Sequence, residues 1–182
     1  MIYVTKMKII NKEYYSNELK ENILPTLQGK VFHVTNAENY ESIKKDNIIK
    51  NNKDKLYKYS YTMSENSYGR KRGYICLFDL RNIKDKELAD TLLKYYFLNP
   101  FSEGVNPVFL VLDKAAYHSL ISWETAKKEV ESNEMYIPYS ECWYRNSIDL
   151  SLISEAIILN IPIVPFDGVV RNFDDLHKLI KE

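Results

Sequence analysis

A histidine and a threonine, separated by one residue, lie in the short apolar segment KVFHVTN. If this segment is a β-strand, His33 and Thr35 share a face with Val31, because alternate side chains of a strand point the same way. Phe32 and Val34 then point to the other side, towards a core. The shared face would present an imidazole and a hydroxyl to a ligand. Taken alone, each residue also has a structural explanation, since threonine is a common strand residue.

A carboxylate beside aromatic residues is the second candidate. Glu141 precedes Cys142, Trp143 and Tyr144 in the sequence. In a strand, Glu141 and Trp143 share one face, while Ser140, Cys142 and Tyr144 share the other. A carboxyl group next to aromatic rings can have a raised pKa, or can hold a hydroxyl group firmly. An exposed glutamate at a sheet edge is the simpler interpretation of this residue alone.

The third candidate is a polar block rich in tyrosine and lysine. Tyr57, Tyr59 and Tyr61 alternate onto one face of an expected strand. Arg70 and Arg72 follow, close to a glycine. Aromatic faces and guanidinium groups suit a ligand with planar rings and phosphates. A solvated lysine-rich loop explains the same composition equally well.

The composition indicates one folded domain over residues 1–182. Hydrophobic residues make up 45% of the chain, which is enough for a core. Lys+Arg and Asp+Glu both number 25, so the net charge is zero. This weighs against a dedicated binder of duplex DNA, but leaves room for a local basic groove.

Two cysteines, Cys76 and Cys142, lie in apolar segments without zinc-ligand spacing. We interpret both as reduced, buried thiols, which are typical of cytoplasmic proteins. The sequence also has no secretory or membrane-spanning apolar run. These features predict a cytoplasmic protein that does not enter the membrane.

The elements that must position these residues follow from periodicity and capping signals. We expect a helix over residues 12–23, a strand over 30–35, a helix capped by Asn36, and a short strand at Ile48-Ile49. Further strands are expected at 57–64, 74–80, 107–113, once or twice within 135–150, and at 155–164. Helices are expected at 84–98, from the cap Asp113 to Val130, and at 172–182, with a turn at 64–73.

Six to eight strands that do not alternate strictly with helices predict a mixed α+β domain.

Two stretches resemble the ADP-ribosyltransferase-like fold, in particular its bacterial members with a His-Tyr/Ser-Glu triad. The first, VFHVTNAENYESIKKDNIIKNN, is similar to the family's opening strand, which ends in His-x-Thr and precedes an Asn-containing helix. Residues in matching places are His33, Thr35, Asn39, Ser42, Ile43 and Ile48. Asp46-Asn47 stands where the family often has a glycine.

The second stretch, IPYSECWYRNSIDLSLISEAIIL, is similar to the strand that carries the family's catalytic glutamate. Glu141, Ile148 and Ile153 stand in matching places, and Asp149 replaces the usual proline. The resemblance covers residues 28–162 in order. It implies two small mixed or antiparallel sheets flanked by helices, with NAD+ bound as a substrate between them.

The resemblance also implies roles for individual residues. Glu141 would be catalytic: it would bind a hydroxyl of the nicotinamide ribose and stabilise the positive charge that develops as nicotinamide leaves. The residues that would hold NAD+ are His33 on a ribose, Thr35 on the adjacent dinucleotide, Tyr59 or Tyr61 against nicotinamide, and Arg70 or Arg72 on the pyrophosphate. No metal is implied.

The expected activity is ADP-ribosyl transfer or NAD+ hydrolysis by a toxin-like protein of a bacterium or phage. The acceptor stays open between a protein and a nucleic acid, and an antitoxin or defence-system protein is a candidate partner. One alternative is a non-catalytic module that binds a nucleotide or a protein. A second is an RNA phosphate-ester enzyme that uses His33 with His118 or His177.

Overall fold

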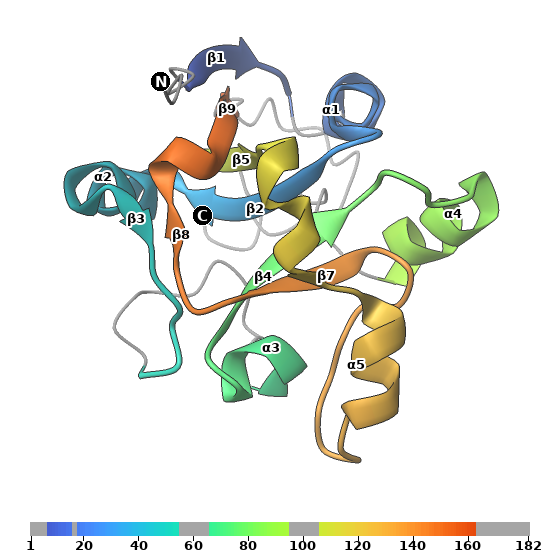
Figure 1. Ribbon diagram of the computed structural model, residues 1–182. Helices are drawn as coiled ribbons and strands as arrows, with labels where there is room; N and C mark the ends of the chain where they lie inside the picture. The colour runs from blue at the N-terminus through green and yellow to red at the C-terminus, as the bar shows by residue number, and fades with distance from the viewer. Residues whose placement is uncertain (1–6, 16–17, 55–65, 95–105, 163–182) are drawn as a thin grey trace, which may run out of the picture.

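The computed structural model describes residues 7–15, 18–54, 66–94 and 106–162, which form a mixed α+β fold (Figure 1). Within these residues there is one seven-stranded mixed sheet and one two-stranded sheet. The large sheet has the order β1-β9-β5-β2-β4-β7-β6. Its strands are β1 (Lys8–Glu13), β9 (Ile153–Asn160), β5 (Pro107–Leu112), β2 (Val31–Asn36), β4 (Tyr74–Asp79), β7 (Glu141–Arg145) and β6 (Leu120–Ile121).

The small sheet pairs β3 (Ile48–Ile49) with β8 (Ile148–Asp149). The helices are α1 (Leu19–Leu27), α2 (Ala37–Asp46), α3 (Tyr68–Lys71), α4 (Asp85–Lys94) and α5 (Trp123–Glu129), with 3₁₀ turns at Lys114–Ser119 and Leu150–Leu152. No helix in these described ranges is long and apolar enough to cross a membrane.

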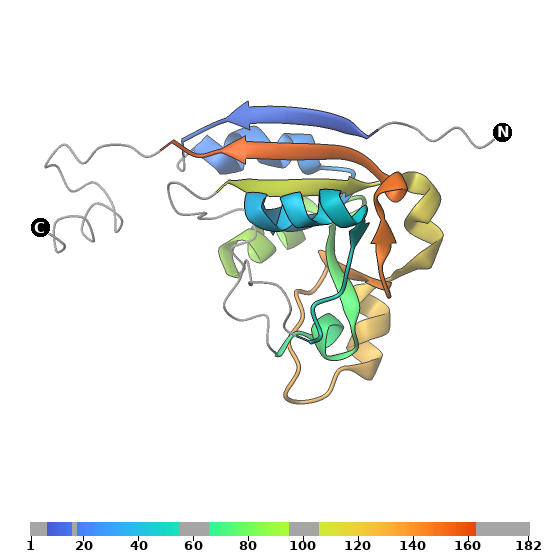
Figure 2. The same ribbon diagram turned by 90° about the vertical axis from the view of Figure 1, so that its left-hand side faces the viewer.

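The large sheet is weakly joined between β2 and β4. Five residue pairs join β2 to β5, but only Val31–Asp79 and Phe32–Phe78 join β2 to β4. Figure 2 shows β4 running at a steep angle to β5 and β9. The sheet therefore consists of a part around β9, β5 and β2 and a part around β4, β7 and β6, which separate just beyond Phe32.

Side chains of β2 alternate between two cores, as its sequence predicts. Phe32 and Val34 pack into a core that includes Ile23 and Leu27 of α1. Val31 faces the second core, which includes Tyr40 of α2. Buried apolar surface on both faces therefore fixes the register of β2 within the sheet, since a shift by one residue would exchange the two faces.

The module formed by β2, α2 and β3 confirms the prediction for residues 30–49. Asn36 caps α2, because its side chain accepts a hydrogen bond of 2.7 Å from the backbone N–H of Asn39. Asn47 ends the helix in the left-handed conformation at φ 56°. A non-glycine residue that tolerates this conformation, usually asparagine, is a common helix terminator.

The helix predicted over residues 12–23 is correct only for residues 19–23. Residues 8–13 form β1, where the start of a helix over 12–23 was predicted, and α1 begins only at Leu19. The cause is a distant interaction: β1 pairs in parallel with β9, from Lys8–Glu155 to Glu13–Asn160. A pairing of this kind leaves no signal in the local periodicity.

The helix predicted from Asp113 to Val130 is correct in its cap and its end but is not continuous. Asp113 caps a 3₁₀ helix that ends at Ser119, because Leu120 and Ile121 pair with β7 as a strand. A separate helix, α5, then begins after the cap Ser122.

Other predictions are corrected in part. The expected turn over 64–73 contains α3, and the strand expected at 155–164 begins at Ile153. The predicted strand at 74–80 is β4, and that at 107–113 is β5. The strand predicted at 57–64, the helix at 172–182 and the last residues of the helix at 84–98 lie outside the described residues.

Candidate functional site

Glu141 is the first residue of β7 and lies close to the junction between the two parts of the sheet. It pairs with Phe78 of β4, which pairs with Phe32 of β2. These three residues form one row across three neighbouring strands. Glu141 is therefore about two strand spacings, or about 10 Å, from the backbone of β2 beside His33. The residue is 7% exposed.

A tight turn before β7 holds the Glu141 carboxylate. Its Oε2 accepts a hydrogen bond of 2.7 Å from the backbone N–H of Ile137. The Glu141 N–H donates in turn to the Ile137 carbonyl at 3.1 Å. Tyr139 in this turn has φ 67°, a conformation that is unfavourable for a bulky residue. Such strain is often found at functional sites.

Burial dominates the electrostatics of Glu141. It raises the pKa of this carboxyl group to about 7, and the hydrogen bond from the Ile137 N–H opposes the rise only in part. Burial also raises the pKa of the Cys76 thiol, which stays neutral. Glu141 is thus divided between its ionised and protonated forms near neutral pH, which suits a group that works as an acid, a base or a charge stabiliser.

Trp143 lies beside Glu141 on the same face of β7, as the strand alternation predicts. Its ring packs edge-on against Tyr68 of α3 at 4.8 Å between ring centroids. Gly69 of α3 lies so close that a Cβ atom there would overlap Trp143 Cδ1 and Nε1. The absence of a side chain at Gly69 is therefore required for Trp143 to lie where it does.

His33 lies at the place where β2 and β4 separate. Its Nδ1–H donates to the Cys76 carbonyl of β4 at 2.9 Å, and the ring is half-buried. Burial lowers the pKa of His33, which favours the neutral ring. Thr35, two residues along β2, is 3% exposed. The histidine therefore bridges the two parts of the sheet in this structure.

His33 and Glu141 are near each other along the sheet, but their side chains leave opposite faces. His33 alternates with Phe32, whereas Glu141 lies in the row of Phe32 and Phe78. An NAD+ molecule shared by the two residues stays a prediction. It requires a ligand that crosses the line along which β2 and β4 separate.

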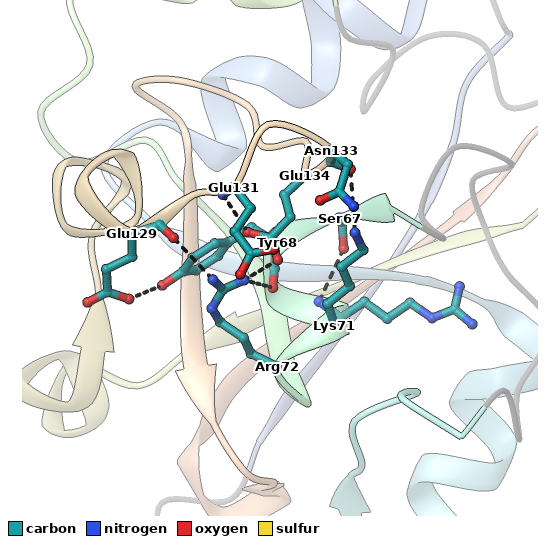
Figure 3. A network of polar contacts seen from close by, with 9 residues as sticks. Ser67, Tyr68, Lys71, Arg72, Glu129, Glu131, Asn133 and Glu134 are labelled. Atoms are coloured by element: carbon teal, nitrogen blue, oxygen red, sulfur yellow. Dashed lines mark hydrogen bonds and ion pairs between the residues drawn. The ribbon is translucent and has the colours of Figure 1, made fainter.

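The two arginines in the predicted site have different surroundings. Arg70 is buried, and its Nε–H donates to the Asn52 carbonyl at 3.2 Å. Arg72 forms an ion pair with Glu134 and lies over the Tyr68 ring, 4.1 Å from its centroid (Figure 3). A pyrophosphate contact of Arg72 stays a prediction, and it would require a phosphate to replace Glu134.

The remaining predicted residues are the tyrosines and two histidines. Tyr59 and Tyr61 lie outside the described residues, as does His177. His118 is exposed, and its Nδ1–H donates to the Ala115 carbonyl at 2.7 Å. Within the described part of the chain, no group of three or more His, Cys, Asp or Glu residues could hold a metal ion.

Sequence reasoning missed two groups at the Glu141 carboxyl, the Ile137 amide and the Cys76 thiol, and the glycine that packs against Trp143, Gly69. A backbone amide has no sequence signature. Cys76 was interpreted only as a buried thiol; it is reduced but half-buried, and its proximity to Glu141 depends on the register of β4 and β7. The one usable signal was Gly69, one of only five glycines in the chain.

Comparison of the chain with protein-family models, with curated proteins and with solved structures returns no match.

Proposed function

We propose that this protein is an NAD+-dependent ADP-ribosyltransferase or NAD+ glycohydrolase on an ADP-ribosyltransferase-like fold, with Glu141 as its catalytic carboxylate. The observation that carries the proposal is the placement of Glu141. Glu141 is the first residue of β7 and is buried. Through Phe78 it lies in one row with Phe32 of β2, next to the point where the sheet separates into two parts. The order His-x-Thr, helix, glutamate strand supports the same assignment.

The proposed chemistry uses the ionised form of Glu141. As the bond between nicotinamide and ribose breaks, positive charge develops on the ribose. A carboxylate fixed by the Ile137 amide would accept a hydrogen bond from a ribose hydroxyl. It would also stabilise the developing charge in a site of low polarity. His33 and Thr35 would hold the rest of NAD+, and Arg70 would face its pyrophosphate. Water or an acceptor group then attacks the ribose carbon.

The test is the release of nicotinamide from NAD+ by the purified full chain, followed by chromatography. Glu141→Gln keeps the shape of the side chain but removes its charge, and should lower the rate by about a hundredfold or more. Glu124→Gln on the exposed surface of α5 is the matched control and should leave the rate unchanged. Equal rates for Glu141→Gln and the unaltered protein would exclude the proposed role.

A non-catalytic nucleotide-binding module is the second candidate. Two observations favour it: the pKa of Glu141 leaves much of this group protonated at neutral pH, and Arg72 is paired with Glu134. Titration calorimetry with NAD+ separates the two functions. Binding without nicotinamide release, in the presence of protein and nucleic-acid acceptors, would support the module and contradict the enzyme.

A further inference from the structure

We propose that Arg72 and Glu134 are positioning residues for Glu141: their ion pair holds the segment whose Ile137 N–H donates to the Glu141 carboxylate. The effect on the carboxyl group can be measured without any enzymatic activity. Only the consequence for catalysis rests on the proposed function.

The ion pair is largely shielded from water. The Glu134 side chain is 3% exposed and that of Arg72 is 23% exposed. Glu134 also accepts a hydrogen bond of 3.0 Å from the backbone N–H of Glu131. Removing one partner of a shielded ion pair costs more than removing one of an exposed pair, because the other charge is left without compensation.

Arg72 connects α3 with the segment that follows α5 through several contacts (Figure 3). Its Nη2–H donates to the Glu129 carbonyl at 3.2 Å, and its Nη1–H donates to the Tyr68 carbonyl at 3.4 Å. The Tyr68 hydroxyl donates to the Glu129 carboxylate at 2.6 Å. The guanidinium therefore lies between an aromatic ring, two carbonyl groups and a carboxylate.

This connection continues towards Glu141 through the backbone. Residues Ser67 and Met135 form a parallel β-bridge. The Met135 N–H donates to the Asn66 carbonyl, and the Tyr68 N–H donates to the Met135 carbonyl, both at 2.9 Å. Glu134 precedes this bridge by one residue and Ile137 follows it by two. The ion pair and the bridge thus fix the segment from which the Ile137 amide reaches Glu141.

The helix α3 also contacts the other side of the site. Gly69 touches Trp143, which shares the face of Glu141 on β7. Among the described titratable groups, the thiol of Cys76 on β4 faces Glu141, and Cys142 interacts with it from β7. Both thiols are neutral because burial raises their pKa. Access of water therefore governs the titration of Glu141 more than nearby charges do.

The positioning role and a direct phosphate-binding role of Arg72 predict different kinetics. If Arg72 positions Glu141, Arg72→Gln and Glu134→Gln should behave alike: kcat for NAD+ falls by about tenfold or more, with KM nearly unchanged. If Arg72 instead binds the pyrophosphate, Arg72→Gln should raise KM, and Glu134→Gln should not. That second result would overturn the inference.

A direct readout is the titration of the Glu141 carboxyl carbon by NMR, assigned by comparison with Glu141→Gln. In both single variants the Ile137 N–H should lose its hydrogen bond to the carboxylate. Because that hydrogen bond lowers the pKa of Glu141, its loss should raise this pKa above about 7. An unchanged titration in folded Arg72→Gln and Glu134→Gln would overturn the inference, whatever the NAD+ result. If the chain has no NAD+ activity, this titration still decides whether the ion pair positions Glu141.

Two further variants control for loss of the fold. The exchanged pair Arg72→Glu with Glu134→Arg keeps both charges and should restore the titration of Glu141. Lys50→Gln breaks the exposed Lys50–Asp46 ion pair of 2.7 Å, which is unrelated to the site, and should leave the titration unchanged. If the single variants do not fold, the exchanged pair alone decides: a Glu141 titration different from that of the unaltered protein would contradict the inference.

Discussion

At the scale of single residues, Glu141 combines two opposing features. Its carboxyl group is buried, which disfavours ionisation, and it accepts a backbone hydrogen bond, which favours ionisation. Burial is the larger of the two effects, so the pKa lies at about 7 instead of 4.5. The group therefore changes its charge within the physiological range of pH, and both activity and stability should depend on it.

The first consequence concerns activity. If ionised Glu141 stabilises the developing charge, kcat/KM for nicotinamide release should rise about tenfold per pH unit below pH 7 and become constant above it. The measurement is a pH–rate profile with the release assay. A profile that is flat through pH 7 would contradict an ionised Glu141 as the active form.

The second consequence concerns stability, and its sign follows from the raised pKa. Between pH 4.5 and about 7 the unfolded chain has lost the proton of Glu141 while the folded chain keeps it. Stability from this group is therefore present at low pH and is lost as pH rises through this window. Relative to the unaltered protein, the free energy of unfolding of Glu141→Gln should increase by about 3 kcal/mol as the pH rises between these values.

Urea unfolding of both proteins at each end of that window checks this prediction. The expected sign is a gain for the Gln variant as pH rises. A difference that stays constant with pH would show that Glu141 titrates normally in the folded protein. Glu124→Gln serves again as the exposed control.

At the scale of secondary-structure elements, α3 meets β7 where Gly69 lies directly against Trp143. Gly69→Ala would place a methyl group within the Trp143 ring position, so Trp143 must move. We expect a loss of about 1–3 kcal/mol in the free energy of unfolding, as for other overpacked sites. Trp143→Phe removes part of the ring, so adding Gly69→Ala to that variant should cost less.

Chemical denaturation of the two single variants and the double variant measures this coupling. Strictly additive losses would mean that Gly69 and Trp143 do not meet in the folded protein.

The same scale shows what the sequence could predict. The module of β2, α2 and β3 was predictable because its signals are local: the alternation around Phe32, the cap Asn36 and the apolar Ile48-Ile49. The helix predicted after Asp113 failed because Leu120 and Ile121 bury themselves by pairing with β7. Of the candidate site, Glu141 and Trp143 were predicted to share a face, and they do. The ion pair of Arg72 with Glu134 was not predicted, since it joins positions far apart in the sequence.

At the scale of the whole molecule, the two parts of the large sheet meet through the two residue pairs of β2 and β4. Phe32 and Phe78 strengthen this junction with ring centroids 5.7 Å apart, and His33 adds its hydrogen bond to the Cys76 carbonyl. The α+β class was predictable from the count of elements, whereas this junction was not, because strand order depends on contacts that no local pattern encodes.

The parallel pairing of β1 with β9 also has a consequence for how the chain folds. Lys8 pairs with Glu155, so the residues between them must leave the ribosome before β1 can join the sheet. Pairings of such long range are slow to form, because much chain entropy is lost first. During synthesis, β1 would remain accessible to chaperones after β2 and β5 have paired, and its docking would be a late step of folding.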